Sequence, residues 1–299
     1  MNIAIIDIGS NTIRLNVYNY KDGKLNLLLG KKNMAGLVSY VDDKKLTDKG
    51  ILKLCRVLKS HGNIVNSVKH DMFCAFATAS LRNLKNTEEV LTYVKDMTDI
   101  DIEMIEQKDE ARLGFDGILS STDIDSGITV DIGGGSTEII RFEDKKIVDM
   151  FNLSEGSLSL YNRCIKGVLP TKDEIKEMQK IVKNELKENC VEADSKTIVG
   201  IGGTIRAIGN VSQEMYTMKQ NNHFSTDDMH NLYDALSNGD KKAIQTVLKV
   251  KPERIHTLIP GMTIFSQLCD SFGTKDIFVS ATGLREGVIY EKLKLKGLL

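Results

Sequence analysis

The stretch DIGGGSTEII, Asp131–Ile140, decides the fold because it is one of two copies of a single pattern. It follows a short apolar run and places three consecutive glycines between an aspartate and a hydroxyl pair. The stretch DIGSNTIRLNV, Asp7–Val17, has the same frame 124 positions earlier. The copies align in four places: Asp7 with Asp131, Gly9 with Gly133, Thr12 with Ser136, and Leu15 with Ile139.

The composition is that of an ordinary globular protein. The chain has 299 residues, of which 41% are hydrophobic and 27% charged, and its formal net charge is −1. This length predicts two domains of roughly 120 to 180 residues. The balanced charge argues against a surface that is basic throughout, so we expect no nucleic-acid partner. No apolar run approaches the roughly 20 residues that a membrane span requires, so we expect no membrane partner.

Cysteine usage and the N-terminal sequence predict a cytoplasmic protein. The cysteines are scattered, without a C-x-x-C pair, which is typical of free thiols in a reducing compartment. The N-terminal apolar run breaks at Asp7 and has no basic region ahead of it, so no secretory signal is expected. The five cysteines are Cys55, Cys74, Cys164, Cys190 and Cys269.

Each copy of the glycine pattern lies in a predicted meander of three strands. In the first, the apolar run Ile3–Ile6 precedes the glycine turn, residues 13–17 then alternate between apolar and polar, and a third strand covers residues 25–29. In the second, the strands cover residues 128–132 and 139–142 and resume at Ile147. The strands and the glycine turn follow one another in the same order in both copies.

Helices and short strands alternate after each meander. In the first half, residues 47–59 and 109–119 have helical spacing, residues 72–77 and 100–105 are strand-like, and Asn86 with Glu89 predicts a helix cap. In the second half, Thr171 with Glu174 forms a capping box for a helix to about Asn189, and the strand-like runs 196–201 and 277–280 precede a closing helix.

The pattern therefore predicts two α/β domains with mixed sheets. The polar stretch Ser120–Gly127 is the best linker candidate. We assign residues 1–120 to the first domain and 121–299 to the second, with the last helix able to pack back on the first.

The glycine turns predict two anion-binding loops. Without Cβ atoms, the backbone N–H groups of such a turn can approach a phosphate closely, and the flanking hydroxyl and amide side chains add donors. An ordinary glycine hairpin would explain one such loop, but the duplication favours two loops that grip one phosphate chain from both sides of a cleft. The predicted phosphate-binding residues here are Gly9, Ser10, Asn11, Thr12, Gly133, Gly134, Gly135, Ser136 and Thr137.

The aspartates that begin the two loops predict a divalent cation. A carboxylate beside a polyanion repels it unless a hard cation lies between them, and Mg²⁺ accepts one or two protein carboxylates while it keeps most of its waters. The candidate metal ligands are Asp7, Asp131 and, at the end of the second loop, Glu138. The alternative is that each aspartate only caps its own turn.

Six ordered motifs carry a resemblance to a known family. They are AIIDIGSNTIRL, AFATASLRN, KDEARLGFDGI, VDIGGGSTEII, VGIGGTIRAI and VSATGLREGVI, and they cover essentially the whole chain. The sequence resembles the exopolyphosphatase and guanosine pentaphosphate phosphatase family of the actin-like ATPase superfamily, in its short form. The resemblance implies two actin-like (RNase H-like) domains, each a mixed sheet flanked by helices, with the active-site cleft between them.

The resemblance also implies roles for individual residues. Glu110 matches the family's general base, and Arg82 and Arg285 match arginines that hold the phosphate chain. Asp131 and Glu138 match acids of the second loop, and Arg14 belongs to the first loop. From the residues themselves, Arg206 after the double glycine Gly202–Gly203 suits an anion. The catalytic candidates are therefore Glu110, Asp131 and Arg82, and Arg14, Arg206 and Arg285 join the phosphate-binding set.

We therefore expect a Mg²⁺-dependent hydrolase that removes the terminal phosphate of inorganic polyphosphate, with guanosine pentaphosphate (pppGpp) as the alternative substrate. We expect the protein to form a homo-oligomer, a dimer. The other hypotheses are a kinase or ATPase of the same superfamily and a phosphate sensor without catalysis. Glu106-Gln107 and Asp109 depart from the family pattern, which affects the turn that leads into Glu110.

Overall fold

The computed structural model describes residues 1–120, 122–189, 194–218 and 220–299, which form two compact units. Unit 1 comprises Met1–Asp116 together with Leu284–Leu299, and unit 2 comprises Gly117–Gly283. The chain therefore enters unit 2 at Gly117, within the last predicted helix of the first domain, and its C-terminal segment belongs to unit 1. Two residues of the sequence analysis, Ser121 of the linker and Cys190, lie outside the described residues.

Unit 1 contains a five-stranded mixed sheet with the order β3-β2-β1-β6-β7. The first three strands form the predicted antiparallel meander, and β6 and β7 continue the sheet in parallel with β1. The strands are β1 (Asn2–Ile8), β2 (Thr12–Lys21), β3 (Lys24–Met34), β6 (Met72–Ala77) and β7 (Ile102–Met104). The helices are α1 (Asp48–Ser67), α2 (Ala79–Arg82), α3 (Thr87–Thr98), α4 (Gln107–Leu119) and α11 (Leu284–Leu295), with a short 3₁₀ turn, Leu37–Tyr40, and a small hairpin of β4 (Val41–Asp42) and β5 (Lys45–Leu46).

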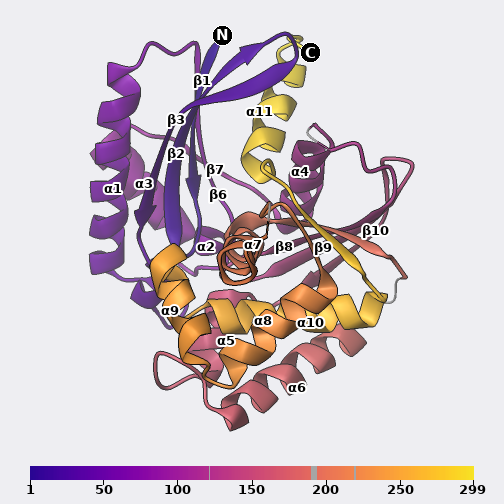
Figure 1. The fold of residues 1–299 in the computed structure, drawn as a ribbon. Coiled ribbons are helices and arrows are strands. Elements are labelled where there is room, and N and C mark those ends of the chain that lie inside the picture. Colours follow the sequence, from indigo (N-terminus) through magenta and orange to yellow (C-terminus); the bar gives the residue numbers. More distant parts are fainter. Residues whose placement is uncertain (121, 190–193, 219) are drawn as a thin grey trace. The chain divides into compact units, whose positions relative to one another are not determined.

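Both faces of β1 are buried, which explains its continuous apolar run. Ile6 and Leu15 pack in one core with residues of α1 and α3. Ile3 and Ile5, on the opposite face, pack with residues of α11. In Figure 1, α1 and α3 lie on one side of β1–β3 and α11 lies on the other, near both chain ends.

Unit 2 repeats this topology in a six-stranded sheet with the order β10-β9-β8-β11-β13-β12. The antiparallel meander β8-β9-β10 again precedes parallel strands, here β11 and β13. The strands are β8 (Gly127–Ile132), β9 (Thr137–Glu143), β10 (Lys146–Leu153), β11 (Thr197–Ile201), β12 (His223–Ser225) and β13 (Asp276–Val279). The helices are α5 (Ser157–Cys164), α6 (Lys172–Glu188), α7 (Gly202–Tyr216), α8 (Thr226–Ser237), α9 (Lys241–Val250) and α10 (Leu258–Phe272), with a 3₁₀ turn at Pro252–Arg254. The predicted fold class, two α/β units with mixed sheets and flanking helices, is confirmed.

Two predicted helix caps have different outcomes. The Thr171 hydroxyl accepts from the Glu174 N–H and the Glu174 carboxylate accepts from the Thr171 N–H, so this capping box is confirmed. Asn86 precedes α3 as predicted, but its side chain makes no cap hydrogen bond. Its amide instead exchanges two hydrogen bonds of 3.0 Å with the backbone of Leu46. Tertiary contact with the β4–β5 hairpin therefore replaced the local cap.

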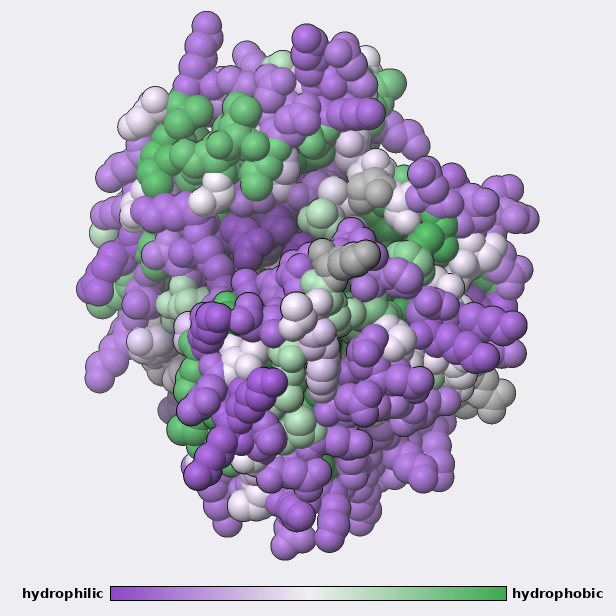
Figure 2. All heavy atoms as spheres, viewed as in Figure 1, coloured by the Kyte–Doolittle hydropathy of each residue, from purple (hydrophilic) through white to green (hydrophobic). Residues whose placement is uncertain are grey.

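The surface is mostly hydrophilic in the view of Figure 2, with an apolar area over the strands β2 and β3 of unit 1. On β3, Leu27 and Leu28 are 57% and 58% exposed. This strand is the edge of its sheet, and its lysines oppose pairing with another chain. Within the described ranges, no helix combines the length and apolar character needed to cross a bilayer.

Helix α11 approaches α4 closely at a glycine. A Cβ atom added to Gly287 would lie 1.8 Å from the carbonyl oxygen of Leu113. The Arg112 guanidinium of α4 also pairs with the Glu291 carboxylate of α11 at 2.6 Å. Gly287 therefore permits the contact that joins the C-terminal helix to unit 1.

We predict that Gly287→Ala lowers the free energy of unfolding by about 3 kcal/mol or more, because the obstructing atom is backbone and one helix must move. Chemical denaturation monitored by circular dichroism measures this. Gly114→Ala is the matched control, since a Cβ there meets nothing within 4 Å. The control should be neutral or stabilise by up to about 1 kcal/mol through helix propensity. Equal stability of the two variants would contradict the proposed close packing.

Candidate active site

The two glycine loops have the same backbone geometry. The N–H of Gly9 donates to the carbonyl of Thr12 at 3.0 Å, and the N–H of Gly133 donates to the carbonyl of Ser136 at 3.0 Å. A Cβ added to Gly9 or Gly133 would lie 3.2 Å from that same carbonyl oxygen. The duplication seen in the sequence is therefore a duplication of turn structure.

The carbonyl groups of each loop are occupied by the segment that follows the meander. In unit 1 the Asn11 carbonyl accepts from the N–H groups of Ala35 and Gly36, both at 2.9 Å. In unit 2 the Gly134 carbonyl accepts from Leu158 at 2.9 Å and from Ser159 at 2.8 Å. These carbonyl oxygens would repel an anion, but each already accepts hydrogen bonds within its own unit.

Gly156 packs closely against the second glycine loop, and the sequence analysis missed it. A Cβ added to it would lie 2.7 Å from backbone atoms of Gly134, Gly135 and Ser136. Gly36 occupies the corresponding place in unit 1, directly before the 3₁₀ turn, with a φ of 58°. A glycine shortly after the third strand of each meander was the signal available in the sequence.

Asp7 lies among cationic residues of unit 1. It is directly opposite Arg14 in the β1–β2 ladder. The Arg285 guanidinium, at the start of α11, lies 3.5 Å from the Asp7 carboxylate, and its side chain is only 11% exposed. Burial opposes the charge of Arg285, but the attraction of Asp7 and Glu286 outweighs it and raises the Arg285 pKa.

Arg82 and Glu110 form a second pair in unit 1. The Arg82 guanidinium contacts the Glu110 carboxylate at 2.9 Å, and the two side chains are 12% and 14% exposed. Arg82 also donates to the carbonyl of Ile105 at 2.7 Å. The Glu106-Gln107 departure from the family pattern lies at the start of α4, where the Glu110 N–H donates to the Glu106 carbonyl at 2.8 Å.

The topology brings these unit 1 residues to one edge of the sheet. Asp7 lies near the carboxyl end of β1, Arg82 ends the helix after β6, and Glu110 lies in the first turn of the helix after β7. These three strands are neighbours and parallel, and ligands of α/β proteins bind outside the carboxyl ends of such strands. The Ser80 hydroxyl ties α2 to this edge by donating to the Ile8 carbonyl at 2.5 Å.

Unit 2 has two carboxylates opposite each other at the positions where unit 1 has an aspartate and an arginine. Asp131 is directly opposite Glu138 in the β8–β9 ladder. Glu138 is 6% exposed and accepts from the Ser136 hydroxyl at 2.6 Å. Like charges in opposite positions of a ladder repel each other. A cation would remove this repulsion, so the donor set fits a divalent ion held by two carboxylates, as Mg²⁺ prefers.

The three predicted metal ligands belong to different units. Asp131 and Glu138 lie together in unit 2, whereas Asp7 lies in unit 1 beside Arg285. In the described ranges no group of three or more His, Cys, Asp or Glu side chains is arranged to hold a metal. A Mg²⁺ ion at this pair would therefore keep several of its waters.

Arg206 lies in the first turns of α7 in unit 2. Its guanidinium donates to the carbonyls of Ser280 at 3.3 Å and Ala281 at 3.2 Å. It lines a cavity of about 300 Å³ together with Asn210 and Asn222. These contacts fix the guanidinium at the carboxyl end of β13, and its role toward an anion stays a prediction.

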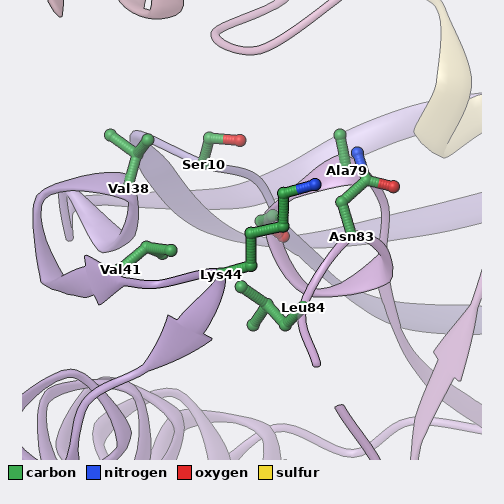
Figure 3. Close-up of a pocket in the computed structure, with 8 residues that line it drawn as sticks. Ser10, Val38, Val41, Lys44, Ala79, Asn83 and Leu84 are labelled. Atoms are coloured by element: carbon green, nitrogen blue, oxygen red, sulfur yellow. The ribbon is translucent and has the colours of Figure 1, made fainter. Parts of the chain in front are cut away.

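A cavity of about 530 Å³ adjoins the first loop through Ser10. Figure 3 shows the Lys44 side chain extending into it on the side of Asn83. Lys44 has a φ of 58°, which is uncommon for a residue with a side chain, and its carbonyl accepts from the Lys85 N–H at 2.7 Å. No carboxylate is among the lining residues, which are Ser10, Val38, Val41, Lys44, Ala79, Ser80, Asn83 and Leu84.

Gly202 leaves room for the Asp131 carboxylate. Its φ is 79°, and a Cβ added to it would lie 2.3 Å from Asp131 Oδ1. We predict that Gly202→Ala lowers the free energy of unfolding by somewhat more than the roughly 1–2 kcal/mol of a left-handed alanine alone, because the end of the Asp131 side chain must also move. Urea denaturation measures this loss.

The matched control is Gly239→Ala, since Gly239 has a φ of 73° and a Cβ there meets nothing within 4 Å. It reports the backbone strain without the contact. Replacing Asp131 by Ala in the Gly202→Ala variant should recover part of the loss. No recovery would show that Asp131 does not contact this glycine.

Comparison with known proteins places the chain in a family. The model of the Ppx/GppA phosphatase family matches residues 16–296. The bifunctional 3-dehydroquinate synthase/phosphatase of Fusobacterium nucleatum is 28% identical over 98% of this chain and 47% of its own length. The guanosine-5'-triphosphate,3'-diphosphate pyrophosphatase of Pseudoalteromonas atlantica is 23% identical over 97% of this chain and 58% of its own length. The chain thus spans about half the length of these curated relatives.

Solved structures match along nearly the whole chain. The Aquifex aeolicus member of the Ppx/GppA family is 28% identical, with a TM-score of 0.82, over 99% of this chain and 98% of that chain. An exopolyphosphatase from Cytophaga hutchinsonii, 22% identical, shares the fold with a TM-score of 0.86 over 100% of this chain and 99% of that chain. The duplicated glycine loops, the acid that heads each loop and the match of the family model to residues 16–296 lead to one conclusion: the chain belongs to the Ppx/GppA phosphatase family.

Proposed function

We propose that the protein is a phosphoanhydride hydrolase that releases the terminal phosphate of inorganic polyphosphate. The observation that carries this proposal is a pair of buried donor atoms in unit 1. Asn11 Nδ2 of the first loop and Arg285 Nε beside Asp7 have no hydrogen-bond partner within the described residues. A buried donor without an acceptor costs about 1–3 kcal/mol, and a phosphate oxygen would satisfy such donors.

Glu110 has the surroundings of a general base. Arg82 contacts its carboxylate at 2.9 Å, and this ion pair orients the Glu110 side chain. We propose that Glu110 orients a water molecule and takes its proton as the water attacks the terminal phosphorus. Phosphoryl transfer to water requires positioning, charge neutralisation and one base, with no covalent nucleophile.

The arginines supply cationic charge for the phosphate oxygens. Arg82 and Arg285 are both largely buried and held by neighbouring carboxylates, so they are oriented before substrate binds. Arg14 and Arg206 complete the proposed phosphate-binding set.

We propose that Asp131 and Glu138 hold a Mg²⁺ ion. When bound, this ion would draw charge from the phosphate oxygens and orient the leaving group. Asp7 has Arg285 as a cationic neighbour, so its charge is already balanced within unit 1. Its part in the proposed metal site is therefore secondary to that of the Asp131–Glu138 pair.

Two related activities remain as alternatives. A guanosine-5'-triphosphate,3'-diphosphate pyrophosphatase is among the similar proteins, so pppGpp is the second candidate substrate. A kinase or ATPase would instead transfer the phosphate of ATP or show micromolar affinity for ATP.

The predicted dimer is not tested by a single chain and stays a prediction.

The test of the proposed function measures orthophosphate release from long-chain polyphosphate, pppGpp and ATP in parallel. We expect polyphosphate to be hydrolysed with Mg²⁺ and not after chelation by EDTA, because the phosphate charge would no longer be neutralised. Preferential hydrolysis of pppGpp would favour the second substrate. Release of phosphate only from ATP would overturn the proposal.

We predict that Glu110→Gln leaves polyphosphate binding nearly intact while phosphate release falls about 10²- to 10⁴-fold, the size of a general-base contribution. Calorimetry measures binding, and an orthophosphate assay measures release. Asp109→Asn is the matched control, because Asp109 is adjacent on α4 and pairs with Arg112 at 3.1 Å. Unchanged turnover in Glu110→Gln would exclude Glu110 as the base.

A further inference from the structure

Two polar residues of β2, Asn16 and Tyr18, do not face solvent. Asn16 and Tyr18 alternate along the strand with the apolar Leu15 and Val17, a pattern that by itself indicates a solvated face. In the structure Asn16 is 5% exposed and Tyr18 is 4% exposed. Tyr18 instead lies in the core cluster that contains residues of α11.

A hydrogen-bonded chain connects β2 to the start of α11. The Asn16 amide donates to the Tyr18 hydroxyl at 2.6 Å, and this hydroxyl donates to the Glu286 carboxylate. Glu286 is 4% exposed. Burial and the neighbouring Glu286 raise the pKa of Tyr18, so the phenol keeps its proton and acts as a donor.

Arg285 joins this chain to Asp7. Its guanidinium lies 3.5 Å from the Asp7 carboxylate, at the mouth of the first loop. Burial opposes the charge of Arg285, but Asp7, Glu286 and Tyr18 are close enough to raise its pKa overall. The Tyr18–Glu286 hydrogen bond therefore anchors the residue next to Arg285 in α11, while Asp7 pairs with the Arg285 guanidinium itself.

Stability does not explain this buried polar cluster. Burying ionised and hydrogen-bonding groups costs several kcal/mol per ion, and replacing such a cluster with apolar residues is often neutral or stabilising. A satisfied buried network does, however, rigidify its members. The cluster is thus suited to fix one side chain in one direction, and that side chain is Arg285.

We propose that Tyr18 and Glu286 are positioning residues that hold the Arg285 guanidinium at Asp7 in the orientation that binds phosphate. This inference rests on the proposed function, because it assumes that Arg285 contacts the phosphate chain. Neither residue would touch substrate. The C-terminal helix would thereby complete the phosphate site that begins at the N-terminal glycine loop.

The test is a double-mutant cycle on binding of inorganic tripolyphosphate in the presence of Mg²⁺, measured by calorimetry. All variants carry Glu110→Gln so that the ligand is not consumed. The four proteins are this parent, Tyr18→Phe, Arg285→Ala and the double variant. A cycle isolates the interaction of the two side chains from their separate effects.

We expect Tyr18→Phe to weaken binding about tenfold in the parent, because one hydrogen bond to a charged group is lost. In the Arg285→Ala background the same substitution should have no further effect. Glu286→Gln should also weaken binding, since Gln keeps a hydrogen-bond acceptor for Tyr18 but loses the charge that attracts Arg285. The inference would be overturned if Tyr18→Phe weakened tripolyphosphate binding equally in both backgrounds, or if it did not weaken binding in the parent.

Two controls separate positioning from stability. Tyr20→Phe changes a tyrosine on the same strand and in contact with the same core cluster, and Glu291→Gln removes the α11 ion pair to Arg112. Both should bind tripolyphosphate as the parent does. Thermal unfolding of every variant shows whether it is folded, and if Tyr18→Phe is not, Glu286→Gln carries the cycle.

The outcomes also distinguish this inference from the proposed function. A parent that does not bind tripolyphosphate would remove the proposed phosphate site and the positioning role together. A parent that still releases orthophosphate would exclude Glu110 as base and leave the cycle readable at short times. A parent that binds, with Tyr18 and Arg285 acting independently, would overturn only the positioning role.

Discussion

The rest of the structure depends on one short backbone turn, made twice. In each unit the first glycine of the loop donates to the carbonyl three residues later, Gly9 to Thr12 and Gly133 to Ser136, both at 3.0 Å. This turn ends the first strand of the meander, places an aspartate at the loop's entrance and begins the second strand. The next segment of each unit then uses the loop carbonyls as acceptors. Side chains at these glycines would disturb both contacts at once.

The two units have the same topology but different chemistry at equivalent positions. The residue opposite the aspartate is Arg14 in unit 1 and Glu138 in unit 2. Unit 1 therefore balances its acid with arginine, and it also contains the Arg82–Glu110 pair. Unit 2 instead places two carboxylates opposite each other.

Much of the fold could be predicted from local pattern. The two meanders, the helix from Thr171 and the strands that follow were visible because apolar periodicity and capping depend on neighbouring residues. The Asn86 cap failed because its amide bonds to Leu46, forty residues earlier in the chain. Asn16 alternates with apolar neighbours along its strand, yet it is buried. No local rule contains the neighbours that decide these positions.

The sequence by itself determined the duplicated loops, the α/β class of both units, and the set of acids and arginines from which a site could be built, because these follow from residue types at fixed spacings. Only the tertiary structure decided that Arg285 lies at Asp7, that Glu110 pairs with Arg82, that Gly202 fits against Asp131 and that the C-terminal helix belongs to unit 1. Each of these contacts joins residues far apart in the chain. Such contacts form only when the sheets and helices are packed, so no short stretch of sequence specifies them.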